Sequence, residues 1–140
     1  MIVLSMSLLA NNGYQGYQEM QAKVNAVVKS DDVVMGSQIY WLGLYDHPYY
    51  SWESLFYYPR YYPGTSLADT FAHYHPDVFI VDSAMDITFL DNVDPSSRAY
   101  YFSIPRKELY NYLDNHSVKV MDDYSSTYGW VRVYRMIGTK

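Results

Sequence analysis

The clearest apolar run in the chain is Val-Phe-Ile-Val at residues 78–81, which lies between Pro76-Asp77 and Asp82-Ser83. Four consecutive large apolar residues bounded by turn-forming residues are typical of a strand that is buried on both faces. Such strands occupy the middle of parallel sheets. We therefore expect the rest of the chain to form layers around this strand.

Residues 14–29 have apolar side chains at a spacing of three to four, which predicts a helix that covers one face of the sheet. These side chains are Tyr14, Tyr17, Met20, Val24, Val27 and Val28. Glu19 and Lys23 are one turn apart on its polar side. The short, β-branched segment 33–36 predicts the first strand.

Later in the chain, Ser66 and Asp69 have the spacing of a capping box, which predicts a helix that ends before Pro76. A second helix is predicted with Pro105 at its first position and Leu109, Tyr112 and Leu113 on its inner side. Residues 117–121 and 130–136 alternate between polar and apolar side chains, which predicts an antiparallel hairpin.

This order of elements predicts an α/β fold, a three-layer sandwich whose mixed, largely parallel sheet ends in an antiparallel C-terminal hairpin. We expect a single α/β domain over residues 13–140. Residues 1–12 form an apolar N-terminal segment, too short to cross a bilayer alone. This segment is either a short element packed on the domain or the outer end of a membrane helix.

Residues 40–62 are crowded with aromatic side chains that follow no single period, and Pro48 and Pro59 exclude one continuous helix. We predict a long irregular connection. Its rings either pack beneath the loop or form a recognition surface for sugars or a membrane boundary. The candidate contact residues are Tyr45, Tyr49, Tyr50, Trp52, Tyr57, Tyr58, Tyr61 and Tyr62.

Composition narrows the possible partners. The 140 residues carry a net charge of −5 without a cluster of Lys or Arg, which argues against a nucleic-acid partner. The chain has no cysteine, which excludes disulfides and thiolate metal sites. The 18 tyrosines are well above ordinary usage.

Catalytic signatures are weak. Asp82 ends a hydrophobic strand, as in aspartate-nucleophile phosphatases, but the next acid, Asp86, is four residues on instead of two. We expect Asp82 to cap the following turn. His73, His75 and Asp77 have poor spacing for a metal, and we expect His47 and His116 to face solvent. No catalytic residue, metal or cofactor is therefore predicted.

Three local patterns carry a family resemblance: residues 32–44 from Asp32 to Leu44, residues 67–82 from Leu67 to Asp82, and residues 128–135 from Tyr128 to Arg135. Together they resemble the C-terminal extracytoplasmic domain of bacterial membrane glycosyltransferases of the dolichyl-phosphate-mannose protein mannosyltransferase type. In that family the catalytic acids lie in an outer loop between early membrane helices, and the donor is a polyprenyl-phosphate sugar. The resemblance therefore carries no catalytic residue onto this chain.

The resemblance implies a non-catalytic soluble domain on the extracytoplasmic face of a bacterial membrane. Its partners would be the membrane domain of the same polypeptide and a glycan or polyprenyl-phosphate sugar. It would assist folding, position the acceptor or shield the active site. One alternative is a free-standing carbohydrate-binding module that uses the same rings. Another is a phosphohydrolase that works through Asp82 and Asp86.

Overall fold

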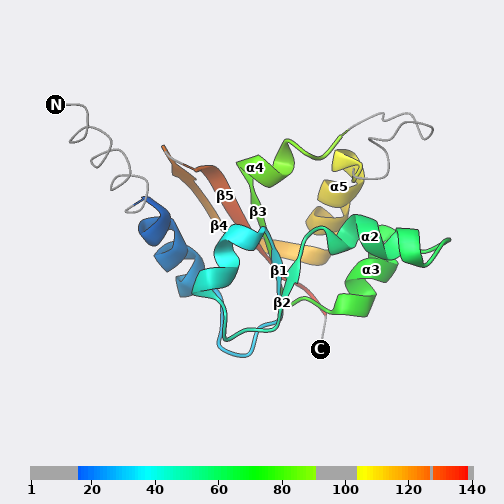
Figure 1. Ribbon diagram of the computed structural model, residues 1–140, viewed down its shortest axis with the longest axis horizontal. Coiled ribbons are helices and arrows are strands. Elements are labelled where there is room, and N and C mark those ends of the chain that lie inside the picture. Colours follow the sequence, from blue (N-terminus) through cyan, green and yellow to red (C-terminus); the bar gives the residue numbers. More distant parts are fainter. Residues whose placement is uncertain (1–15, 91–103, 127, 139–140) are drawn as a thin grey trace.

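The computed structural model describes residues 16–90, 104–126 and 128–138. Within these residues the chain forms a mixed sheet whose strands have the order β2-β1-β3-β5-β4 (Figure 1). The strands are β1 (Val34–Gly36), β2 (Tyr49–Ser51), β3 (Val78–Asp82), β4 (Ser117–Ser125) and β5 (Gly129–Met136).

Strand direction divides the sheet into two halves. β1 pairs in parallel with β2 and with β3, whereas β5 pairs antiparallel with β3 and with β4. The α/β class, the mixed sheet and the C-terminal hairpin are therefore confirmed. The sheet is parallel at one end only, so the expectation of a largely parallel sheet holds for β1, β2 and β3.

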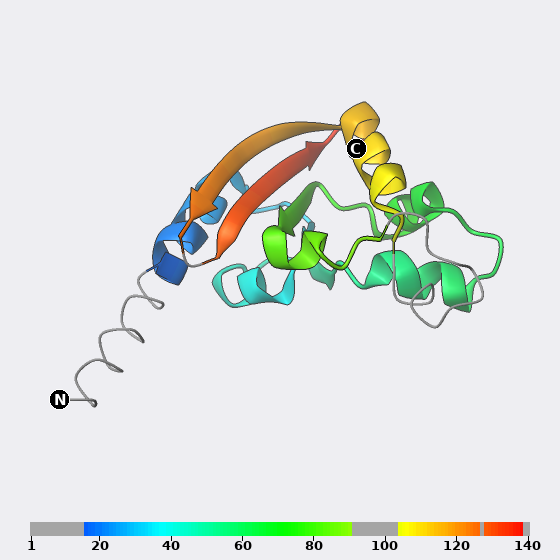
Figure 2. The same ribbon diagram turned by 90° about the horizontal axis from the view of Figure 1, so that it is seen from above.

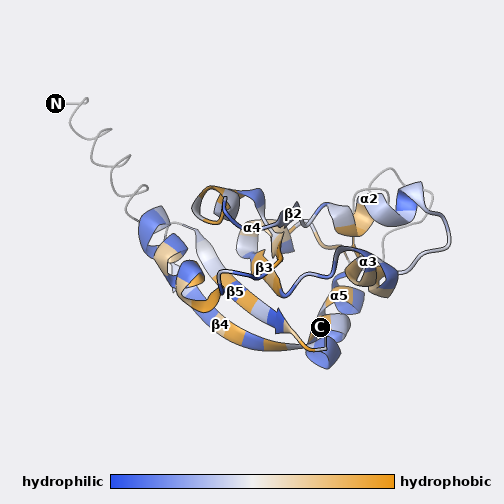
Figure 3. Cartoon of the chain, turned by 90° about the horizontal axis from the view of Figure 1, so that it is seen from below, coloured by the Kyte–Doolittle hydropathy of each residue, from blue (hydrophilic) through white to orange (hydrophobic). Residues whose placement is uncertain are grey.

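β3 is the central strand, and all five of its residues are buried. Its side chains alternate between two core clusters. Phe79 and Val81 belong to one cluster, and Val78 and Ile80 belong to the other. The prediction that this strand is buried on both faces is confirmed, and the strand is orange in Figure 3, where orange marks hydrophobic residues.

The helices cover the two faces of the sheet unequally (Figure 2). One core cluster joins the sheet to the N-terminal helix, described over residues 16–27, and to the 3-10 helix η1 (Gln38–Gly43). The other joins it to α2 (Ser54–Tyr61), α3 (Leu67–Tyr74), α4 (Ser83–Asp86) and α5 (Arg106–His116). None of the helices in the described ranges is both long and apolar enough to cross a bilayer.

The prediction of an irregular connection over residues 40–62 is wrong. This stretch contains most of η1, the edge strand β2 and the helix α2. No single period was visible because three short elements each bury a different side. Pro59 lies inside α2. Proline has no N–H, so α2 lacks the hydrogen bond that residue 59 would donate to the Leu55 carbonyl oxygen.

The predicted caps are largely confirmed. Ser66 and Asp69 form a reciprocal capping box at the start of α3. α3 ends at Tyr74, and the next residue, His75, has a φ of 47° that turns the chain toward Pro76. Asp82 caps α4 by accepting a 2.7 Å hydrogen bond from the Met85 N–H. α5 begins at Arg106, one residue after the predicted start, with Pro105 in the cap position.

Ion pairs connect distant parts of the chain. Arg135 of β5 donates to both carboxylate oxygens of Asp32 at 3.0 and 2.9 Å. It also donates to the carbonyl oxygen of Val27 at the end of the N-terminal helix. Lys23 of that helix pairs with Asp123 of β4 at 2.6 Å.

Candidate functional site

Aromatic side chains from α2, α3 and β2 meet on one side of the molecule. We call Tyr50, Tyr58, Tyr62, His73 and Tyr74 the ring surface. Tyr58 is its centre: it stacks on His73 with the ring centroids 4.6 Å apart, and it contacts Tyr62 at 4.8 Å. Tyr74 lies 5.9 Å from Tyr58 and 4.8 Å from Tyr50, so the rings form a continuous path.

Solvent reaches the outer parts of this surface. The exposed fraction is 57% for Tyr62 and 38% for Tyr50. Tyr57 and Tyr61 also belong to α2, and their exposed fractions are 38% and 75%. A helix advances by about 100° per residue, so Tyr57 and Tyr61 lie on the side of α2 next to the one that carries Tyr58 and Tyr62. Flat rings with hydroxyl tips in such an array suit a ligand with both apolar faces and polar groups.

Three of the predicted contact residues lie elsewhere. The Trp52 ring is half-buried in the core, 5.6 Å from the Phe56 ring and 5.7 Å from the Phe89 ring. Tyr49 donates a 2.6 Å hydrogen bond to the Ser37 carbonyl oxygen, and burial raises the pKa of its hydroxyl. Tyr45 is 75% exposed but follows Leu44, which is buried in the opposite core cluster. Of the predicted contact residues, the structure therefore places Tyr50, Tyr58 and Tyr62 in the ring surface, and Tyr57 and Tyr61 beside it on α2.

A groove of about 420 Å³ lies on the other side of α2, between this helix, the start of α3 and the start of α5. Its apolar lining includes Leu55, Leu67 and Ile104, and the exposed side chains of Arg60 and Glu108 add opposite charges. This groove was not predicted from the sequence. Its walls come from residues 55–67 and from residues 104–108, and no local pattern connects these two segments.

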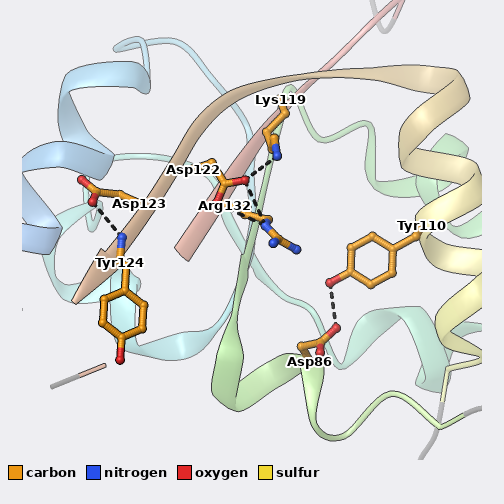
Figure 4. A network of polar contacts seen from close by, with 7 residues as sticks. All are labelled: Asp86, Tyr110, Lys119, Asp122, Asp123, Tyr124 and Arg132. Atoms are coloured by element: carbon orange, nitrogen blue, oxygen red, sulfur yellow. Dashed lines mark hydrogen bonds and ion pairs between the residues drawn. The ribbon is translucent and has the colours of Figure 1, made fainter. Parts of the chain in front are cut away.

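A network of polar contacts occupies the concave side of the hairpin, toward α4 and α5 (Figure 4). Asp122 of β4 pairs with Lys119 and with Arg132, and the Arg132 guanidinium lies 4.2 Å from the centre of the Trp130 ring. Nearby, Tyr110 donates a 2.7 Å hydrogen bond to Asp86. Burial, and then this bond, raise the pKa of Tyr110. Lys119 and Arg132 thus share one carboxylate, that of Asp122.

Asp82 and Asp86, the two carboxylates considered for phosphate chemistry, make hydrogen bonds within the fold. Asp82 is only 4% exposed and caps α4. Asp86 accepts from Tyr110, and Arg106 donates to the Asp86 carbonyl oxygen at 2.9 Å. The predicted capping role of Asp82 is confirmed.

The histidines also have structural contacts. His73 stacks on Tyr58, and His75 forms the left-handed end of α3. No group of three His, Cys, Asp or Glu in the described ranges could hold a metal ion. The prediction that His47 faces solvent is wrong: its side chain is 8% exposed, and its Nδ1 lies 3.2 Å from the Asp32 carbonyl oxygen. His116 is exposed at the end of α5.

Comparison of the chain with protein-family models, with curated proteins and with solved structures finds no match in any of the three. A functional assignment therefore depends on the residues themselves. Among the features described, the ring surface has the chemistry most suited to an external ligand.

Proposed function

We propose that this chain is a non-catalytic, carbohydrate-recognising domain of a membrane-embedded glycosyltransferase that uses a polyprenyl-phosphate sugar. The domain would stand on the extracytoplasmic face of a bacterial membrane, fused to the membrane domain of the same polypeptide. Its role would be to position the acceptor or shield the active site, while the bond-forming groups lie in the membrane domain. We also propose that the helices on the two faces of the sheet make it a three-layer sandwich.

The observation that carries the proposal is the ring surface, extended along α2 by Tyr57 and Tyr61. Aromatic side chains normally bury their faces, and the faces that stay exposed tend to mark interaction sites. A pyranose presents C–H groups on its faces and hydroxyls around its rim. Tyrosine matches this pattern, because its ring is apolar and its tip forms hydrogen bonds.

The groove on the opposite side of α2 supports the same ligand class. This groove carries Arg60 and Glu108 beside its apolar lining. A guanidinium donates and a carboxylate accepts hydrogen bonds, so the pair suits hydroxyl groups without requiring a charged ligand. α2 thus separates a stacking surface from a groove with polar groups beside its apolar lining.

The membrane assignment is supported by the sequence. The three patterns at residues 32–44, 67–82 and 128–135 resemble that enzyme family, and residues 2–10 are mostly apolar. The genomic reading frame tests it: repeated apolar spans of about 20 residues encoded in frame upstream are expected. A stop codon in frame shortly before residue 1 would contradict the membrane assignment and favour the free-standing carbohydrate-binding module.

Carbohydrate recognition is tested by nuclear magnetic resonance titration of the chain with a panel of neutral oligosaccharides. We expect shifts in the signals of Tyr50, Tyr58, Tyr61 and Tyr62. The double substitution Tyr61→Ala and Tyr62→Ala should weaken binding at least about fivefold, since stacked rings contribute about 0.5–1.5 kcal/mol each. Tyr124→Ala, a 70% exposed ring on β4, is the matched control and should bind as the unmodified chain does. The absence of saturable shifts across the panel would refute carbohydrate recognition.

A further inference from the structure

A second group of exposed apolar side chains lies on the opposite face of the sheet from the ring surface. Ile39, Trp41 and Leu42 of η1 and the nearby Tyr45 are exposed by 37%, 50%, 68% and 75%. We call these four residues the η1 edge. Large apolar side chains scattered singly on a surface are ordinary, but four within seven residues are a feature that needs a partner.

The shape of η1 explains why these side chains point outward. A 3-10 helix has three residues per turn, so side chains three apart are eclipsed and the helix has three sides. Tyr40 is on the inner side and is 2% exposed in the core, with Leu44 buried just after the helix. Ile39 and Leu42 share a second side, and Trp41 lies on the third. Anchoring by Tyr40 therefore directs three large apolar residues away from the core.

η1 is held firmly against the N-terminal helix. The Tyr17 hydroxyl donates to the Ile39 carbonyl oxygen at 2.9 Å, and the Asn25 amide donates to the Gly43 carbonyl oxygen at 3.2 Å. The two elements are so close that a Cβ on Gly43 would lie 2.2 Å from the Gln21 side chain. The η1 edge thus has a fixed position beside the N-terminal helix, whose described residues begin at 16, a short distance in the sequence after the apolar residues 2–10.

We propose that the η1 edge inserts into the headgroup region of a lipid bilayer. Tryptophan and tyrosine prefer this depth because one end of each ring is apolar and the other forms hydrogen bonds, while leucine and isoleucine reach the acyl boundary. The inference rests on the proposed function only in that the domain works beside a membrane. It deepens that function by naming the surface that faces the lipid.

Charge specifies the kind of bilayer. The chain carries a net charge of −5, and Asp46, next to Tyr45, has a side chain exposed by 71%. Binding through the η1 edge is therefore apolar and not electrostatic. It should be strongest on uncharged headgroups, insensitive to salt, and weaker on vesicles that contain phosphatidylserine.

The experiment uses the full chain with phosphatidylcholine vesicles that carry brominated acyl chains, which quench nearby indoles. Trp41 emission should shift to the blue and be quenched, whereas Trp52 and Trp130 pack against the core cluster on the other face. In Trp41→Phe the quenching should disappear. Leu42→Ser should lower the vesicle partition coefficient about tenfold, because it removes the transfer of one leucine side chain into lipid. Val118→Ser, a 55% exposed apolar residue on β4, is the matched control and should leave the partition coefficient unchanged.

The proposal is overturned if vesicles do not bind the chain, if they bind it without quenching Trp41, or if phosphatidylserine strengthens binding. It is also overturned if Leu42→Ser abolishes a dimer in sedimentation experiments without changing vesicle binding, because the edge would then contact a second copy. The double variant with Tyr61→Ala and Tyr62→Ala distinguishes the insertion of the η1 edge into lipid from carbohydrate recognition by the ring surface. It should keep its vesicle binding and lose only its oligosaccharide binding.

Discussion

Gly129 begins β5 with a backbone conformation that other residues adopt at a cost. Its φ is +72°, and a Cβ at this position would lie 2.1 Å from the Ser83 hydroxyl oxygen. The same hydroxyl donates to the Tyr128 carbonyl oxygen at 2.9 Å, so it has little freedom to move away. The start of the last strand therefore depends on the absence of a side chain.

We expect Gly129→Ala to lower the free energy of unfolding by about 2–4 kcal/mol, from left-handed backbone strain together with the clash against Ser83. Gly64→Ala is the control, because Gly64 also has a positive φ, of 92°, but no atom within 4 Å of the added Cβ. It should cost only the backbone strain, about 1 kcal/mol. Urea denaturation measures both, and equal losses would show that Ser83 does not constrain the site.

At the scale of elements, α3 shows how local signals place a helix. The Ser66 hydroxyl accepts from the Asp69 N–H at 3.2 Å, and the Asp69 carboxylate accepts from the Ser66 N–H at 2.8 Å. Hydrogen bonds to the Asp69 carboxylate, from the Ser66 hydroxyl and then from the Ser66 N–H, hold the pKa of Asp69 below its usual value. α3 also carries His73 and Tyr74, so the cap fixes the helix on which part of the ring surface lies.

Ser66→Ala should destabilise the protein by about 1 kcal/mol, as the loss of an N-cap does. Asp69→Ala should have a similar effect. Because each residue bonds the other, the double variant should lose less than the sum of the two single losses. Thermal or urea unfolding of the four chains in this cycle measures the coupling, and strict additivity would mean that the two bonds are independent.

Alternation along β4 and β5 was also readable, and Figure 3 shows the change of colour along β4. Val131 and Val133 lie in one core cluster and Tyr134 in the other, as the period of two requires. A bulge between Lys119 and Met121 interrupts the register. Nothing in the local pattern of residues 117–121 predicted the bulge, because pairing with β5 decides it.

At the scale of the whole molecule, the pair of Asp32 and Arg135 ties the end of the N-terminal helix to the last strand. The Asp32 side chain is 2% exposed and that of Arg135 is 25% exposed. Burial alone would raise the pKa of Asp32, but hydrogen bonds from Arg135 and from the Lys29 N–H hold it below its usual value. The pair is therefore stabilised in its charged form.

We expect Asp32→Asn to lower the free energy of unfolding by about 2–4 kcal/mol, because it leaves Arg135 partly buried beside a neutral amide. Asp46→Asn provides the comparison. The Asp46 side chain is 71% exposed, and its carboxylate lies as far as 3.6 Å from the Nε2 atom of His47. That change should fall within about 0.5 kcal/mol. Urea denaturation at pH 7 tests the pair, and similar losses for both variants would contradict its role.

The pH dependence follows from the direction of the same shift. A carboxyl whose pKa is lower in the folded state stabilises the fold fully above its unfolded pKa, which is about 3.9. This stabilisation is lost as the pH falls through the folded pKa. The difference in stability between the unmodified chain and Asp32→Asn should therefore be constant above about pH 5 and shrink below about pH 4. A difference that stays constant down to pH 2 would show that Asp32 does not titrate with folding.

The aromatic stretch shows where prediction from the sequence stopped. Its rings were identified as candidate contacts. Tyrosine and tryptophan both have an apolar ring with a polar group, so either can pack in a core or face solvent. The sequence therefore did not show that Trp52 is packed in the core and Tyr61 is exposed. The structure places the Trp52 ring against Phe89 and leaves Tyr61 75% exposed. The period of α2 could have suggested this division, had Pro59 not argued against a helix.

The sequence by itself determined the elements whose signals are local: the buried strand at residues 78–82, the capping box of α3 and the alternating hairpin. Hydrophobic periodicity and side-chain caps act over a few residues, so they can be read in order along the chain. The tertiary structure alone decided which rings meet on α2, where the groove lies, and that Lys23 pairs with Asp123. These features join segments that are distant in sequence, and only the packing of the whole fold brings them together.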